Sequence, residues 1–117
     1  MGFQGRRLYG SLFVSVFLLT AEAWASLVQN PRNRLDAVRP VVEALGGSME
    51  SCWTAFGEYD VVAILQMPDH VSVAAFSMAV SAGGAIKAIK TTPLMSMEEG
   101  VEAMKKASGV GYQAPTG

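Results

Sequence analysis

Residues 53–69 read WTAFGEYDVVAILQMPD, and this stretch decides the fold. Its second half is a nearly continuous apolar run, which is typical of a strand buried in a sheet. Pro68 ends that run, because proline has no N–H to continue the ladder. Gly57 is the one residue ahead of the run that takes a positive φ without a steric penalty, so we expect the turn there. The stretch therefore predicts two antiparallel strands, 49–55 and 59–67, joined by a tight turn.

The apolar stretch near the N-terminus allows two interpretations. Two arginines precede apolar residues 8–19, and a small-x-small sequence follows at 23–25, which resembles a signal peptide and its cleavage site. The stretch is too short to span a membrane. The same residues are rich in Phe and Val and can form a strand over 9–18. We favour the strand, because a helix that begins after Thr20 fits the following residues better than a cleavage region does.

End signals and helical periodicity predict the helices and the remaining strand. The residues expected to begin or end helices are Thr20, Asn30 with Pro31, Gly46 with Gly47, Asp69, Gly83 with Gly84, and the capping box of Ser96 and Glu99. Pro40 is expected to bend the second helix. A strand is expected at 86–95, with Pro93 near a sheet edge. In the last helix, Met97, Val101 and Met104 form a stripe expected to face inward.

The predicted order is β-α-β-β-α-β with a C-terminal helix, and the first α is split in two. This order is typical of an α+β, ferredoxin-like fold, in which helices cover one face of a four-stranded antiparallel sheet. We expect one domain over residues 1–107 and a flexible tail at 108–117, which is rich in Gly and Pro. The uncovered sheet face predicts pairing with a second copy, since burying apolar area contributes roughly 25 cal/mol per Å².

The sequence Gly-Glu-Tyr-Asp at 57–60 resembles the signature of the GYD domain family. The resemblance extends over about 9–107 and includes Leu45-Gly46-Gly47, Gly83-Gly84-Ala85 and the threonine pair at 91–92. It implies a dimeric α/β barrel made of two ferredoxin-like domains. A similar turn occurs in the effector-binding domains of leucine-responsive regulators, so the resemblance implies a fold without a particular activity.

Composition excludes several classes of function. Half of the 117 residues are hydrophobic, 16% are charged and the net charge is −1. We expect no nucleic-acid partner, because such binding needs a clustered positive face. The single cysteine, Cys52, excludes an intrachain disulfide and a cysteine-based metal cluster, and is expected to act as a small apolar strand residue. With no phosphate loop, metal-ligand spacing or nucleophile elbow, we expect neither cofactor nor metal. We expect a cytoplasmic protein without a membrane partner.

The candidate ligand-binding residues lie mostly on the predicted hairpin. They are Trp53, Phe56, Gly57, Tyr59, Asp60 and His70. Tyr59 and Asp60 are the strongest pair, although we favour a structural role in which Asp60 ties the turn and the Tyr59 ring packs at the sheet end. Trp53 and Phe56 could line an apolar pocket or an interface. His70, the single histidine, is expected to be a solvated helix-start residue. No catalytic residue is identified.

Two functions follow as hypotheses. The first is a homodimer or larger even-numbered oligomer that acts as a small-molecule-binding or assembly domain and takes an apolar or aromatic ligand in a cleft at the subunit interface. The second is a cofactor-independent enzyme of the monooxygenase or isomerase type, as the resemblance to dimeric α/β-barrel proteins implies. The second requires a buried Tyr, Asp or His with a shifted pKa in a pocket.

Overall fold

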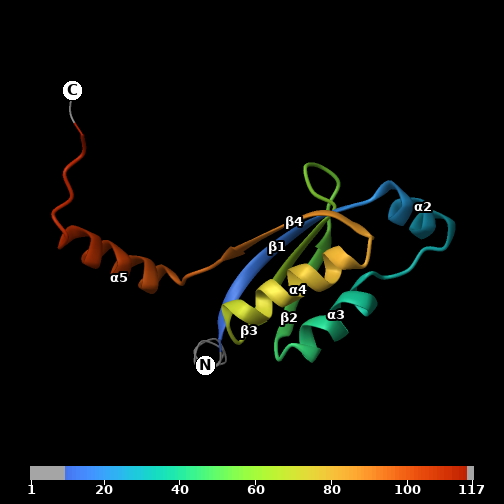
Figure 1. Cartoon of the computed structure of the whole chain (residues 1–117), viewed down its shortest axis with the longest axis horizontal. Helices are drawn as coiled ribbons and strands as arrows, with labels where there is room; N and C mark the ends of the chain where they lie inside the picture. The colour runs from blue at the N-terminus through green and yellow to red at the C-terminus, as the bar shows by residue number, and fades with distance from the viewer. Residues whose placement is uncertain (1–9, 116–117) are drawn as a thin grey trace.

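A four-stranded antiparallel sheet forms the centre of the protein in the computed structural model, which describes residues 10–115 (Figure 1). The strands are β1 (Ser11–Leu19), β2 (Ser48–Thr54), β3 (Val61–Met67) and β4 (Ile86–Pro93), and the helices are α2 (Ala21–Gln29), α3 (Leu35–Ala44), α4 (His70–Ala82) and α5 (Met97–Ser108). The strand order is β2-β3-β1-β4, with every pair antiparallel. The α+β, ferredoxin-like prediction is confirmed, and β4 is an edge strand, as Pro93 indicated.

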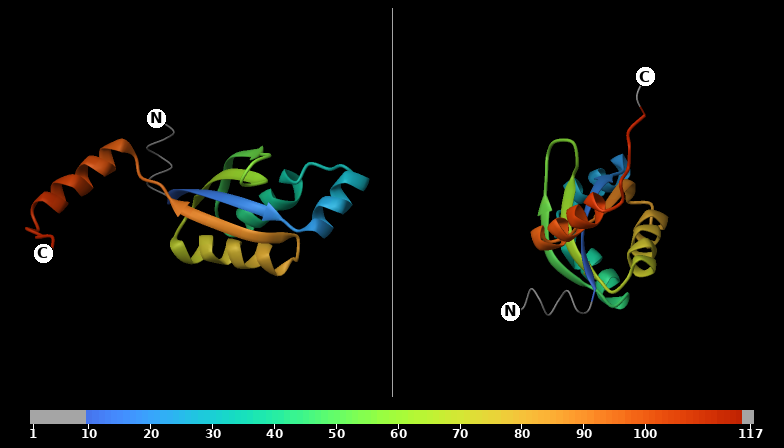
Figure 2. Two further views of the ribbon diagram at one scale, coloured as in Figure 1. Left: turned by 90° about the horizontal axis from the view of Figure 1, so that it is seen from above. Right: turned by 90° about the vertical axis from the view of Figure 1, so that its left-hand side faces the viewer.

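Helices α3 and α4 cover one face of the sheet (Figure 2). Strand residues alternate between faces, so β1 directs Phe13 and Phe17 towards these helices. They pack in a core with residues from the other elements: Val42, Ala63, Leu65, Met67, Val73 and Phe76. Ser15, also on this face, is fully buried and bonds to the Thr91 hydroxyl at 2.8 Å. The core therefore lies in a single layer between the sheet and two helices.

The opposite face of the sheet carries apolar side chains and no helix. Residues paired across antiparallel strands share a face, so the register defines this surface. We call it the open face; its apolar members are Leu12, Val14, Val16, Leu18, Trp53, Val62, Ile64 and Ala88. Gln66, Lys90 and Thr92 lie on the same face. Trp53 stands at its β2 edge and is 65% exposed. No helix of the described chain packs on this face (Figure 2).

The strand interpretation of the N-terminal apolar stretch is confirmed by β1. This strand lies in the middle of the sheet and pairs with both β3 and β4. The predicted start of the strand at Tyr9 and the arginines before it lie outside the described residues, as do the last two residues of the predicted tail. Within residues 10–115, no helix has the length and apolar character needed to cross a membrane.

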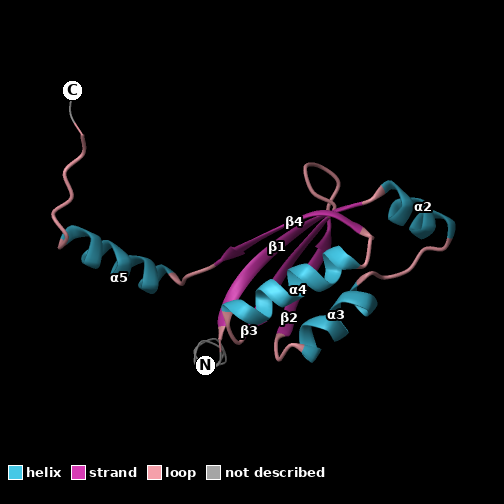
Figure 3. Cartoon of the chain, viewed as in Figure 1, coloured by secondary structure: helices cyan, strands magenta, loops and turns pink. Residues whose placement is uncertain are grey.

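The tight turn predicted at Gly57 is wrong. Residues 55–60 form a longer loop between β2 and β3 that projects beyond the sheet (Figure 3). Gly57 is not among the described glycines with positive φ, and a Cβ placed on it would meet nothing within 4 Å. The Ala55 N–H donates to the Asp60 carbonyl oxygen at 2.8 Å and closes the loop. A loop of this length reverses the chain without a left-handed residue at its tip.

Most of the predicted helix ends are confirmed. Thr20 Oγ1 accepts from the Ala23 N–H at 3.1 Å, and Asp69 Oδ1 accepts from the Ser72 N–H at 2.8 Å. The capping box is formed in both directions by Ser96 and Glu99. Gly46 follows the end of α3 and Gly84 follows the end of α4, and both adopt the left-handed conformation that ends a helix, with φ values of +85° and +83°.

The predicted start of α3 at Asn30 and Pro31 is wrong. The helix begins at Leu35, whose N–H donates to Asn33 Oδ1 at 2.9 Å. An asparagine that caps from this position leaves the residues before it irregular. Pro40 lies inside α3, which continues past it to Ala44. The irregular segment after α2 contributes to the pocket described below.

The inward-facing stripe predicted on α5 is wrong. Met97, Val101 and Met104 are 85%, 47% and 68% exposed. The helix projects from the end of β4 away from the sheet, so its apolar side has no described partner (Figure 1). The spacing of apolar residues predicts a stripe on the helix, but it does not show whether the helix lies close enough to the sheet for that stripe to pack.

Candidate functional site

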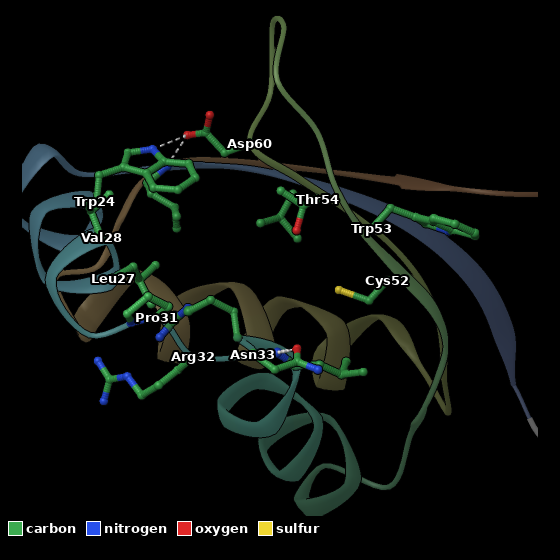
Figure 4. A pocket seen from close by; sticks show the side chains of 14 residues that line it. Trp24, Leu27, Val28, Pro31, Arg32, Asn33, Cys52, Trp53, Thr54 and Asp60 are labelled. Carbon is green, nitrogen blue, oxygen red and sulfur yellow. Dashed lines mark hydrogen bonds between the residues drawn. The ribbon is translucent and has the colours of Figure 1, made fainter.

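A pocket of about 500 Å³ lies where α2, the segment that leads into α3 and the ends of β1, β2 and β3 meet (Figure 4). Its apolar wall includes Leu19, Trp24, Leu27, Val28 and Val61, and its polar groups include Arg32, Asn33, Arg34, Thr54 and Asp60. It lies on the helix side of the sheet, because Cys52 and Thr54 pair with the core-facing positions of β3. Helix α3 contributes only its first residue, Leu35, to the lining of this pocket, and no residue of α4 lines it.

Helix α2 forms one wall because its start is tied to the sheet. The Thr20 N–H donates to the Ala85 carbonyl at 2.9 Å, just before β4 begins. From there Trp24, Leu27 and Val28 follow at helical spacing, and all three line the pocket. No residue of α2 is buried, so its apolar stripe lies on an open cavity and not on the core.

Asp60 connects the elements around the pocket through hydrogen bonds. Its Oδ2 accepts the Leu19 backbone N–H at 2.8 Å and the Trp24 indole N–H at 3.3 Å. Its own N–H donates to the Phe17 carbonyl at 2.8 Å. The partners are thus on β1 and α2, whereas we expected the carboxylate to tie the turn in which it lies. One side chain positions both the last residue of β1 and the aromatic wall of the pocket.

The other hairpin candidates do not direct side chains into the pocket. Trp53 borders it through its strand, but its ring points away, towards the open face (Figure 4). Phe56 is fully exposed, and Gly57 lies beside it in the loop. The Tyr59 ring is half-buried and lies 5.9 Å from Lys90 Nζ, at cation–π distance. Of the predicted hairpin residues, Asp60 alone contributes its side chain to the cavity.

His70 lies at the other end of the sheet. It is exposed at the start of α4, and its ring meets the Phe13 ring edge-on at 5.9 Å. It borders a second, separate pocket of about 420 Å³ near the end of β4. In β1, Ser11 pairs with Met67, close to His70 in sequence, whereas Phe17 pairs with Val61, next to Asp60. At about 3.3 Å per residue, the length of the strand separates the two sites.

Several pocket residues were not predicted as site residues. The stripe of Trp24, Leu27 and Val28 and the interrupted basic run at 32–34 were visible in the sequence, but no local signal joined them. Cys52 lines the same cavity, half-buried, and burial raises the pKa of its thiol. A raised pKa keeps the thiol protonated, as expected of an unreactive strand residue.

Metal binding has no support among residues 10–115, which contain no group of three or more His, Cys, Asp or Glu side chains that could hold an ion. The pocket offers apolar surface, one carboxylate and two guanidinium groups. Such a lining can bind and orient an organic molecule.

The sheet order and the helices on one face define an α+β protein with a ferredoxin-like fold. The family model of the GYD domain matches residues 13–104, which is most of the chain, and the chain belongs to this family. The matched range includes the Gly-Glu-Tyr-Asp sequence and all fourteen residues that line the pocket at α2. No curated protein and no solved structure matches the chain.

Proposed function

We propose that this GYD-domain protein is a homodimer, or a larger even-numbered oligomer, that binds a small apolar or aromatic molecule in the pocket at α2. The pocket itself is the observation that carries the proposal. Its volume of about 500 Å³ is in the range of small-molecule sites, and its wall combines an indole and aliphatic side chains with a few polar groups. The Trp24 ring, fixed by its bond to Asp60, provides a preformed aromatic surface.

The open face supports the oligomer. Its central side chains, among them Val14, Val16 and Ile64, are apolar and have no described cover. Burial against the same face of a second copy would remove this area from water with two-fold symmetry, giving the dimeric α/β barrel. In that arrangement the pocket is on the other side of the sheet, so we place the ligand within one subunit instead of between subunits.

A cytoplasmic location is part of the same proposal. Cleavage of the chain before Ser26 would remove β1, the strand on which both β3 and β4 pair. A protein that loses this strand loses the middle of its sheet. We therefore propose that residues 11–19 serve as a strand of the sheet and not as part of a cleaved signal.

The enzymatic alternative has no specific observation in its favour. It would need a base or acid among Tyr59, Asp60 and His70 close to one cavity. His70 borders a different pocket, and Asp60 Oδ2 already accepts two hydrogen bonds. Binding is what the arrangement supports best.

The two tryptophans provide a direct test, because one lines the pocket and the other faces away from it. In ¹⁵N-labelled protein each indole N–H gives its own NMR signal, and Trp53→Phe assigns the pair. Added 1-naphthaleneacetamide, a neutral aromatic probe, should shift the Trp24 signal in a saturable way and leave the Trp53 signal in place. If neither this amide nor the corresponding carboxylate, 1-naphthaleneacetate, shifts the Trp24 signal, binding in this pocket is contradicted.

A further inference from the structure

We infer that the pocket at α2 takes its ligand as an anion, an aromatic or aliphatic carboxylate whose charged end is bound by Arg34. This inference rests on the proposed function and specifies the chemistry of the ligand. The observation behind it is that Arg34 is half-buried, lines the cavity and forms no ion pair within the described chain.

Arg34 lies between two cavities. It lines the pocket at α2 and also a narrow apolar crevice beneath it, between the sheet and helices α3 and α4. The other residues of that crevice are Phe17, Leu19, Val38, Cys52, Val61, Val80 and Ile86. Arg34 is thus the one charged residue in an otherwise apolar crevice, and it is half-buried.

No carboxylate of the described chain neutralises Arg34. Within residues 10–115 its guanidinium forms neither an ion pair nor a side-chain hydrogen bond. A cation partly withdrawn from water without a partner is unfavourable, and an anion that reaches it recovers the lost interaction. The guanidinium fork matches a carboxylate in a bidentate geometry, which a single ammonium cannot reproduce.

The charges of the pocket also set the direction of the ligand. Asp60 and Trp24 lie on one side of the cavity, and Arg32 and Asn33 lie on the other (Figure 4). An anionic group is repelled by the Asp60 carboxylate and attracted to the arginine side. The apolar body of the ligand then packs against Trp24, Leu27 and Val28, with its carboxylate at Arg34 and a second cation, Arg32, close by in the sequence.

The test compares two probes that differ mainly in charge. 1-Naphthaleneacetate and 1-naphthaleneacetamide have the same ring and almost the same shape, and each is titrated while the Trp24 indole signal is followed. We expect the acetate to bind the wild-type protein at least about ten-fold more tightly, as one charge-assisted hydrogen bond implies. Arg34→Gln should lower acetate affinity by about ten-fold and leave amide affinity unchanged.

A matched control removes the same charge elsewhere. Lys105 is exposed on α5 and does not line the pocket, so Lys105→Gln should leave the affinities of both probes unchanged. Should Arg34→Gln fail to fold, salt dependence in the wild-type protein replaces it: acetate binding should weaken with added salt while amide binding does not.

The possible outcomes separate this inference from the proposed function. Equal affinity of the two probes in the wild-type protein, acetate affinity that is insensitive to Arg34→Gln, or acetate affinity that is insensitive to salt would overturn the anion site and leave a neutral-ligand pocket standing. If neither probe shifts the Trp24 signal, the proposed function fails, and the anion site fails with it.

Discussion

The indole N–H of Trp24 and the carboxylate of Asp60 are joined by a hydrogen bond of 3.3 Å, although the two residues are 36 positions apart in the sequence. The same oxygen of Asp60 accepts the Leu19 N–H at 2.8 Å. The last residue of the Gly-x-Tyr-Asp sequence therefore connects the end of β1 to the first turns of α2. Through this connection it sets the position of the aromatic wall of the pocket.

Asp60→Ala should destabilise the protein by about 1.5 kcal/mol or more, because it leaves the Leu19 N–H without its charged acceptor. Asp60→Asn retains an oxygen acceptor and should cost less than about 1 kcal/mol. Urea unfolding measures both values. An Asn variant as unstable as the Ala variant would show that the charge of Asp60, and not its capacity to accept a hydrogen bond, stabilises the fold.

Gly57→Ala should be neutral or slightly stabilising, within about 1 kcal/mol, because Gly57 has ordinary φ and open space around its Cα. Gly84→Ala is the matched comparison: its surroundings are also open, but its φ is +83°. That substitution should cost about 1 kcal/mol or more through backbone strain. Thermal melting of the two variants measures both effects. A larger drop in melting temperature for Gly57→Ala than for Gly84→Ala would contradict the loop geometry.

Val14→Asp should break the proposed oligomer, since Val14 lies on β1 at the centre of the open face. A charge buried between two sheets without a partner is strongly unfavourable. Sedimentation velocity at micromolar concentration should show an oligomer for the wild-type protein and a 12.4 kDa monomer for the variant. Val71→Asp, on the exposed side of α4, makes the same chemical change and should remain oligomeric. A monomeric wild-type protein would refute the proposal.

Asp69 should make the start of α4 sensitive to acid. The Ser72 N–H bonds to its carboxylate and lowers the pKa of Asp69 below its ordinary value. A pKa lowered in the folded state stabilises the protein above the unfolded pKa, about 3.9, and that contribution is lost as pH falls through the folded value. The stability difference between wild type and Asp69→Asn should therefore be present at about pH 5 and shrink below about pH 4. A difference that grows towards low pH would contradict this assignment.

Local signals in the sequence determined most of the elements. The apolar run before Pro68 predicts β3, Thr20 and Asp69 predict helix starts, and Ser96 with Glu99 predicts the start of α5. These signals work because each acts within one turn of helix or along one strand, where sequence neighbours are also spatial neighbours. The β-α-β-β-α-β order followed from them, and with it the open face of the sheet.

Tertiary structure alone decided how the site is assembled. The strand order β2-β3-β1-β4 brings Asp60 beside Leu19 and places α2 next to the end of β2, so residues 19–35 and 52–61 surround one cavity. The same geometry separates His70 from Asp60 by the length of β1 and leaves the Met97 side of α5 without a surface to pack on. Such contacts depend on which strands become neighbours across the sheet, a property that no short stretch of the chain contains by itself.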